Sequence, residues 1–186
     1  MIATSLSDGE LYSHWTDVLD LKWPWQNFTP IELASKREGE FYLHPRSFDA
    51  LQRARTMLGM PVYVNSGHRS WLHNIAVGGA PLSNHRFFAA DISLVGFEGM
   101  LGLLYRVLRK VGFKGFGFYS TFIHVDMGRG RFWFGSDGSQ AMWMPVLSQP
   151  VEAVPKKMSF VSVLMSIPKT EMEVPSQNVP EIVSVA

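Results

Sequence analysis

The chain has 186 residues, of which 46% are hydrophobic and 18% charged, so it can bury a sizeable core in one domain and is not a disordered chain. Seventeen Lys and Arg residues against 16 Asp and Glu give a net charge of +1 without a block of like charge, which argues against nucleic-acid binding. The sequence has no cysteine, which excludes disulfides and thiolate ligands and leaves His, Asp and Glu to bind any transition metal.

Residues 1–26 are predicted to form a short helix followed by a linker. Ser7 and Glu10 have the spacing of a capping box ahead of apolar residues at 11, 15 and 18. The first residues lack a basic segment followed by an apolar run, so we expect no signal peptide and synthesis in the cytoplasm. The apolar stretch 160–167 is too short to span a bilayer, so we expect no membrane partner.

The main domain is predicted to span residues 27–135 and to mix helices with strands. Helices are predicted from the apolar periodicity and the Gly and Pro boundaries at residues 47–58, 70–77 and 97–111, with a further helix start at 29–32. Strands are predicted at residues 61–65, 89–95, 116–119, 122–127 and 131–134, the last three antiparallel and joined by tight turns. This mixture predicts an α+β fold with a small, mainly antiparallel sheet and helices packed on one face.

Residues 136–186 are predicted to form an extended C-terminal arm. Proline recurs at 145, 150, 155, 168, 175 and 180, which disfavours helices and central strands. Apolar residues at 161–165 fit one edge strand. We expect the arm to lie on the domain or on another subunit, and a disordered arm is the alternative interpretation.

Two histidines and an aspartate have the chemistry of a hydrolytic zinc site. Such a site uses three protein ligands and leaves one position for water, whose pKa the ion lowers toward neutrality. His85 is predicted in a loop, Asp91 at the start of a strand and His124 within a strand, so they meet only if those strands are neighbours. The alternative is a surface histidine, a carboxylate that bonds a backbone amide and a strand histidine without a ligand role.

Several multi-residue pieces carry a resemblance to a known family. In chain order they are Asn27-Phe28-Thr29 with Glu32-Leu33, Val64-Asn65 with Gly67 and Arg69-Ser70, Asn74 with Val77-Gly78-Gly79-Ala80, Ser83 with His85, Ala89-Ala90-Asp91, His124-Val125, and Gly130-Arg131-Phe132-Trp133. The stretch 27–135 thereby resembles the zinc D-Ala-D-Ala carboxypeptidases and related murein peptidases of the lysostaphin, D-Ala-D-Ala peptidase and hedgehog fold group.

The resemblance implies that zinc is held by His85, Asp91 and His124. It also implies that Arg69 binds the terminal carboxylate of the substrate, a role that suits the donor fork of a guanidinium, although a structural salt bridge is the alternative. The implied substrate is a D-amino-acid-containing stem peptide of peptidoglycan. Further substrate-binding candidates are Ser83, Phe122 and Trp133, and aromatic residues at 87, 88, 122 and 133 are expected to wall a shallow groove.

The chain departs from the family pattern in the spacing of the ligands. Five residues separate His85 from Asp91, where the family usually has six including a glycine. The shorter connection either turns the Asp91 carboxylate away from the two histidines or is absorbed in the turn.

The second departure concerns the general base. Related enzymes carry a His or Glu shortly before the last ligand, and no such residue precedes His124. Asp126 is the best substitute as a proton relay because strand side chains alternate and it shares the face of His124, but it also suits a partner that orients His124. His68 is a weaker candidate base, and Tyr119 is a candidate donor to the developing oxyanion or an ordinary half-buried strand aromatic.

Two functions follow from these residues. The first is a zinc-dependent peptidase that cleaves D-amino-acid-containing bonds of peptidoglycan and acts at the cell wall after lysis or from a virion. A phage endolysin or virion-associated lytic protein would explain the missing export signal, and a bacterial enzyme with unconventional export is the alternative.

The second function is a catalytically weak or inactive structural component of a phage virion or tail that contacts other virion proteins through residues 1–26 and 136–186. A zinc-free module that binds peptide termini is a third interpretation, and it depends on Arg69 alone.

Overall fold

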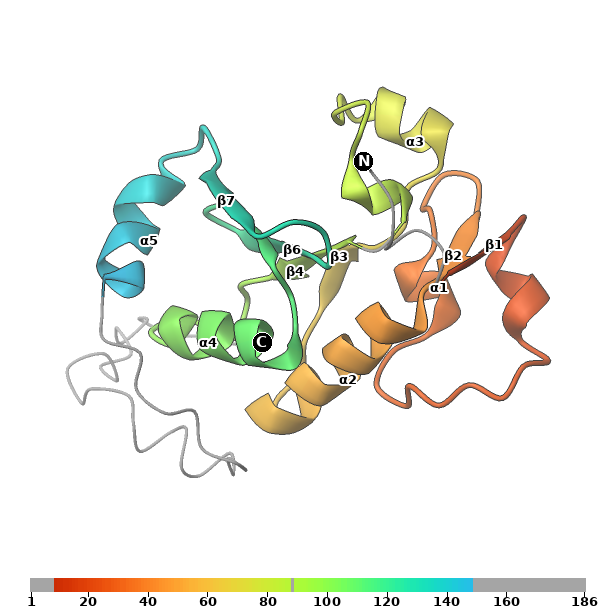
Figure 1. The fold of residues 1–186 in the computed structure, drawn as a ribbon, viewed down its shortest axis with the longest axis horizontal. Helices are drawn as coiled ribbons and strands as arrows, with labels where there is room; N and C mark the ends of the chain where they lie inside the picture. The colour runs from red at the N-terminus through yellow and green to blue at the C-terminus, as the bar shows by residue number, and fades with distance from the viewer. Residues whose placement is uncertain (1–8, 88, 149–186) are drawn as a thin grey trace, which may run out of the picture.

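The computed structural model describes residues 9–87 and 89–148 (Figure 1). In chain order the elements are β1 (Glu10–Tyr12), η1 (Trp15–Val18), α1 (Pro30–Leu33), β2 (Phe41–Leu43), α2 (Pro45–Leu58), β3 (Val64–Ser66), α3 (Trp71–Ala76), η2 (Asn84–Arg86), β4 (Ala89–Ser93), α4 (Leu101–Val111), β5 (Gly115–Phe118), β6 (Phe122–Asp126), β7 (Arg131–Phe134) and α5 (Ser139–Leu147), where η marks a 3₁₀ helix. Among these described residues, no helix is both long and apolar enough to cross a membrane.

The main sheet has five strands in the order β3-β4-β6-β5-β7. The pairs β3–β4, β4–β6 and β6–β5 are antiparallel, so the predicted α+β fold with a mainly antiparallel sheet is confirmed. The prediction that β7 continues the antiparallel run is wrong, because β7 pairs with β5 in parallel. Both edges of β6 are already occupied by β4 and β5, so β7 cannot pair with β6 and pairs with the outer edge of β5.

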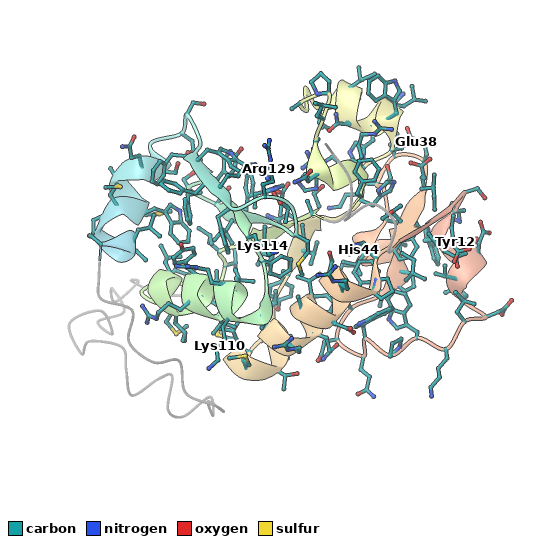
Figure 2. The ribbon with its side chains drawn as sticks, viewed as in Figure 1. Tyr12, Glu38, His44, Lys110, Lys114 and Arg129 are labelled. Carbon is teal, nitrogen blue, oxygen red and sulfur yellow. The ribbon has the colours of Figure 1, made fainter. Side chains whose placement is uncertain are left out.

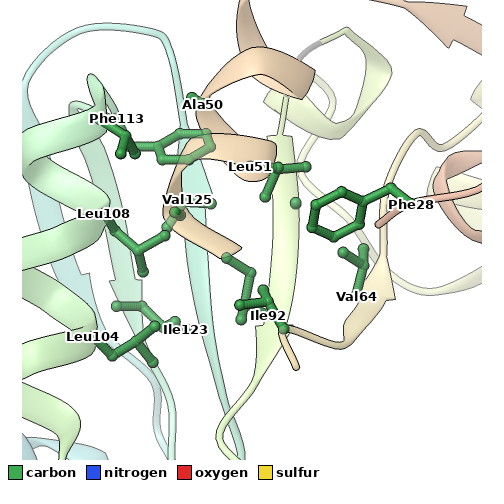
Figure 3. Close-up of a cluster of buried hydrophobic side chains, with 14 of the residues drawn as sticks. Phe28, Ala50, Leu51, Val64, Ile92, Leu104, Leu108, Phe113, Ile123 and Val125 are labelled. Carbon is green, nitrogen blue, oxygen red and sulfur yellow. The ribbon is translucent and has the colours of Figure 1, made fainter. Parts of the chain in front are cut away.

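The helices α2 and α4 cover one face of this sheet (Figure 1). Strand side chains alternate, and the apolar side chains of β4 and β6 point toward the helices. Figure 3 shows Leu104 and Leu108 of α4 lying over Ile123 of β6, in a cluster of buried side chains that also contains Ile92 and Leu51. This apolar face leaves the opposite face of the same strands free for polar side chains.

Local signals in the sequence set the ends of α1 and α2. The Glu32 carboxylate accepts a bond from the Thr29 backbone N–H at 3.4 Å, as the predicted capping box requires. Helix α2 begins two residues earlier than predicted because the His44 side chain accepts a bond from the Ser47 N–H at 3.2 Å (His44 is labelled in Figure 2). It ends where Gly59 adopts a left-handed conformation with a φ of 68°.

The N-terminal segment differs from the predicted helix. Residues 10–12 form β1, which pairs antiparallel with β2 and places Leu11 opposite Tyr42, and η1 follows as a short 3₁₀ turn. Ser7 of the expected capping box lies outside the described residues. The free edge of β2 offers the backbone of residues 10–12 hydrogen bonds that an isolated helix of this length cannot match.

The predicted arm also begins differently, since residues 139–147 form α5. Pro145 lies inside this helix and removes one backbone hydrogen bond. The burial of Trp143 offsets this loss, because its ring packs 4.8 Å from that of Phe118 and its Nε1 donates to the Tyr119 carbonyl at 2.9 Å. Residues 149–186, including the predicted strand at 161–165, lie outside the described residues.

Candidate metal centre

The three predicted zinc ligands converge at the face of the sheet opposite α2 and α4. Asp91 of β4 and His124 of β6 are paired across neighbouring strands, and η2 brings His85 against them. The Asp91 Oδ1 atom lies 3.0 Å from His85 Nε2 and 2.9 Å from His124 Nδ1, and the two nitrogens are 3.0 Å apart. The shorter connection between His85 and Asp91 is therefore absorbed without turning the carboxylate away.

Each of these three residues has a second partner that orients its ligand atom. His85 donates from Nδ1 to the Gly67 carbonyl at 2.7 Å, which leaves the Nε2 lone pair facing the cluster. His124 donates from Nε2 to Asp126 Oδ2 at 3.2 Å, which leaves the Nδ1 lone pair facing the cluster. Asp91 uses its other oxygen, Oδ2, to accept from Arg69 Nη2.

Asp126 lies beyond His124 as seen from the cluster. It contacts Nε2 of the imidazole, whereas the ligand atom is Nδ1, and its other donors are the Gly128 N–H at 2.7 Å and Arg131 Nη2 at 2.8 Å. Burial raises the pKa of this carboxyl, but the bond to His124 and the charge of Arg131 outweigh burial and lower it. This geometry favours the alternative interpretation, a residue that orients His124, and the proton relay stays a prediction.

Two glycines of β5 allow these side chains to reach across the sheet. Gly117 is paired with His124 on one side and with Trp133 on the other, and Gly115 is paired in the same way with Asp126 and Arg131. A Cβ atom at Gly117 would lie 2.5 Å from the Trp133 ring, and one at Gly115 would lie 2.2 Å from the Asp126 carboxylate. Sequence reasoning assigned no site role to the two glycines or to Arg131, although the alternation Gly-Phe-Gly-Phe at 115–118 marks a strand with one face bare of side chains.

Three aromatic side chains form a surface beside His124, which we call the aromatic shelf (Tyr119, Phe122 and Trp133). The Tyr119 and Phe122 rings stack at 4.2 Å, and the Trp133 ring centroid lies 5.1 Å from that of His124. Trp133 Nε1 donates to the Tyr119 hydroxyl oxygen at 3.1 Å, so the hydroxyl proton of Tyr119 is not used in this bond. Phe87, another residue expected to wall the groove, packs edge-on against Tyr42, and Phe88 lies outside the described residues.

Two of the remaining predicted site residues, Ser83 and Arg69, contact the ligand residues from outside the cluster. The Ser83 hydroxyl accepts from the His85 N–H at 3.3 Å and caps η2, so its contact is with the ligand loop. Arg69 contacts Asp91 and also donates from Nε to the Ser66 hydroxyl at 2.9 Å. The His68 side chain is turned toward Glu40, and its Nε2 atom lies 2.9 Å from Glu40 Oε1. This contact does not suit the role of general base, for which His68 is the weaker candidate.

The electrostatics of the cluster suit a cation. Burial raises the pKa of Asp91, but the bonds and charges of the two histidines outweigh burial and hold this pKa well below its usual range. Burial lowers the pKa of His85, so its neutral, ligand-competent form is favoured. Burial also lowers the pKa of His124, but the bonds to Asp126 and Asp91 outweigh it and raise this pKa, so a metal ion has to displace a proton from His124 at low pH.

The chain matches a known protein family. Residues 26–126, more than half of the chain, match the family described as Peptidase M15. The chain belongs to the peptidase M15 family. This confirms the resemblance to zinc D-Ala-D-Ala carboxypeptidase-like enzymes. No curated protein sequence matches the chain at a significant level.

Peptidases of the M15 family are metallopeptidases that depend on zinc, and the donor set of this M15 chain fits that ion. The ligand atoms are two imidazole nitrogens and one carboxylate oxygen, all buried and all within 4.8 Å of one another. Tetrahedral zinc with bonds of about 2.0–2.1 Å separates its ligand atoms by roughly 3.3 Å, close to the 2.9–3.0 Å sides of this triangle. Three protein donors leave one position for substrate or water, which is typical of a catalytic zinc site.

Proposed function

We propose that this chain is a zinc-dependent peptidase that hydrolyses D-amino-acid-containing peptide bonds of bacterial peptidoglycan. The observation that supports the proposal is the convergence of three oriented donor atoms in a chain of the M15 family. Peptidoglycan stem peptides are the proposed substrate, since peptidases of this family act on substrates of that type.

The roles of the side chains follow from their contacts. Zinc held by His85 Nε2, Asp91 Oδ1 and His124 Nδ1 would polarise the scissile carbonyl and lower the pKa of the attacking water. Asp126 fixes the tautomer and the ring orientation of His124 through Nε2.

The aromatic shelf serves the substrate in this proposal. Tyr119 can donate its hydroxyl proton to the oxygen on which negative charge develops, because its bond to Trp133 uses only an acceptor position. The faces of Phe122 and Trp133 lie on the same side of the sheet as His124 and offer apolar contact to the stem peptide.

We further propose a phage-encoded enzyme that acts at the cell wall after lysis or from a virion. This part of the proposal depends on the location of the proposed substrate in the bacterial cell wall. A structural component of a virion is the alternative if the protein proves inactive.

Zinc content and hydrolysis measured on the same protein test the proposal. We expect about one zinc per chain for the wild type by elemental analysis, and release of new amino groups from purified peptidoglycan. His85→Ala should lose both while retaining its circular dichroism spectrum, and His14→Ala, which removes a histidine outside the cluster, should retain both. A folded wild type that binds no zinc would rule out the mechanism, and a zinc-loaded wild type without hydrolysis would favour a structural role.

A further inference from the structure

The position of Arg69 is set by its own backbone and by the sheet. Its backbone N–H donates to the His85 carbonyl at 2.7 Å, which ties the residue to the loop that carries one candidate ligand. Its side chain is only 17% exposed and lies against strand β4. Arg69 is therefore held between two of the three candidate ligands.

One edge of the Arg69 guanidinium is already occupied. Nη2 donates to Asp91 Oδ2, and Nε donates to the Ser66 hydroxyl at 2.9 Å. Ser66 of β3 is paired with Asp91 of β4, so the sheet places the hydroxyl and the carboxylate next to each other on that edge. The Ser66 hydroxyl and the Asp91 carboxylate occupy the Nε–Nη2 fork, which would otherwise donate side-on to a substrate carboxylate.

The contact with Arg69 gives the two carboxylate oxygens of Asp91 different partners. Oδ1 faces the two histidine nitrogens, and Oδ2 faces Arg69, so a single carboxylate oxygen is presented to a cation. The carboxylate is 8% exposed, and a buried carboxylate requires a matched positive charge. Arg69 supplies that charge and holds the donor triangle together before an ion binds.

A substrate anchor needs different properties. An arginine that binds the terminal carboxylate of a substrate has to offer an unmatched charge and a free pair of donors. The charge of Arg69 is matched by Asp91, and one of its two donor forks is taken. We propose that Arg69 is a positioning residue that fixes Asp91, and that it is not the anchor of a substrate carboxylate, an inference that rests on the proposed zinc peptidase function.

This assignment has a consequence for the substrate. If no carboxylate has to pair with Arg69, the enzyme has no need for a free C-terminus next to the scissile bond. Internal bonds of cross-linked stem peptides then qualify as substrates alongside terminal ones.

Zinc affinity and a matched pair of peptides test the inference on the full chain. Arg69→Met should weaken zinc binding by about 10- to 100-fold, measured by competition with a chelating dye, because partners of metal ligands contribute on this scale. At saturating zinc, the wild type should cleave a stem peptide with an amidated C-terminus within about threefold of the rate for the free acid. Arg69→Lys, which keeps the charge but loses the Nε donor, should lie between the wild type and Arg69→Met in zinc affinity.

The controls separate this inference from the proposed function. Arg86→Met removes another arginine, which belongs to η2 and lies over the Trp71 ring, and should leave zinc affinity unchanged. Ser66→Ala tests the same network if Arg69→Met fails to fold, and a several-fold weaker zinc affinity is expected. Two results together would overturn this inference and leave the proposed function intact. The first is an unchanged zinc affinity in a folded Arg69→Met. The second is a wild type that cleaves the free acid at least about tenfold faster than the amidated peptide, a preference that Arg69→Met lacks. A wild type that binds no zinc would instead overturn the proposed function.

Discussion

At the scale of single residues, Asp126 shows how a buried charge is stabilised beside the candidate metal centre. Its carboxylate is fully buried and accepts hydrogen bonds from the Gly128 backbone, from His124 and from Arg131. These partners hold its pKa below the ordinary value of 3.8 despite burial. The folded state therefore takes up a proton on Asp126 less readily than the unfolded state does.

The sign of the resulting pH dependence follows from this shift. The ionised carboxylate stabilises the fold fully at pH values above 3.8, and the contribution is lost as the pH falls through the lowered pKa. We expect the unfolding free energy of the metal-free protein to fall as the pH is lowered below about 4. Asp126→Asn should cost about 3 kcal/mol near neutral pH, as expected for a broken buried ion pair, and should flatten this acid-dependent slope.

Urea denaturation between pH 3 and pH 6 measures this effect. Asp20→Asn, a substitution at an exposed position, serves as the control and should keep the wild-type slope. Equal slopes for Asp126→Asn and the wild type would show that Asp126 does not contribute to the acid dependence.

At the scale of elements, strand β5 separates the core from the candidate site. Phe116 and Phe118 point toward α4 and are buried, while Gly115 and Gly117 alternate with them on the site face. The missing side chains leave room for Asp126 above one glycine and for Trp133 above the other. A single four-residue strand thus supplies both core packing and the space that the site requires.

A methyl group added at Gly117 should disturb the aromatic shelf. Its Cβ would lie 2.5 Å from the Trp133 ring, so the ring has to move or the strand has to shift. We expect Gly117→Ala to cost about 1–3 kcal/mol in unfolding free energy, as overpacking does, and to lower peptidase activity by displacing Trp133. Gly130→Ala is the control, because a Cβ at Gly130 meets no atom within 4 Å. Similar losses of stability in the two variants would contradict this explanation.

At the scale of the whole molecule, α5 packs on the far end of the sheet and supports the site from the opposite face. Trp143 has an exposed fraction of 0%, and its Nε1 donates to the backbone carbonyl of Tyr119, the residue that carries the shelf hydroxyl. Trp143 therefore anchors residues 139–147 to the packed core, which the proline content of the sequence did not indicate.

Removal of the Trp143 side chain tests this contribution. We expect Trp143→Ala to lower the unfolding free energy by about 3–5 kcal/mol, the usual loss for a large buried aromatic residue, when measured by chemical denaturation. Met144→Ala in the same helix removes a side chain that is 48% exposed and should stay within about 0.5 kcal/mol of the wild type. An effect of Trp143→Ala no larger than that of Met144→Ala would mean that α5 adds little to the stability of the domain.

The parts of this protein that sequence alone predicted depend on short-range signals. The capping box at Thr29, the left-handed Gly59 and the apolar periodicity of α2 and α4 act within a few residues, and each marks an element that the structure contains. The residue types and order of His85, Asp91 and His124 likewise identified the candidate ligands and the family before any geometry was known.

Tertiary structure alone decided which partners these elements and side chains acquired. The parallel pairing of β7 with β5, the pairing of β1 with β2 and the packing of α5 depend on edges and cavities formed by residues distant in the chain. The same holds for Asp126, which lies beyond His124, and for Arg69, whose guanidinium pairs with Asp91. The physical reason is that a charged or polar side chain contacts whichever buried group the folded backbone brings within about 3 Å, and no local pattern in the sequence encodes that distance.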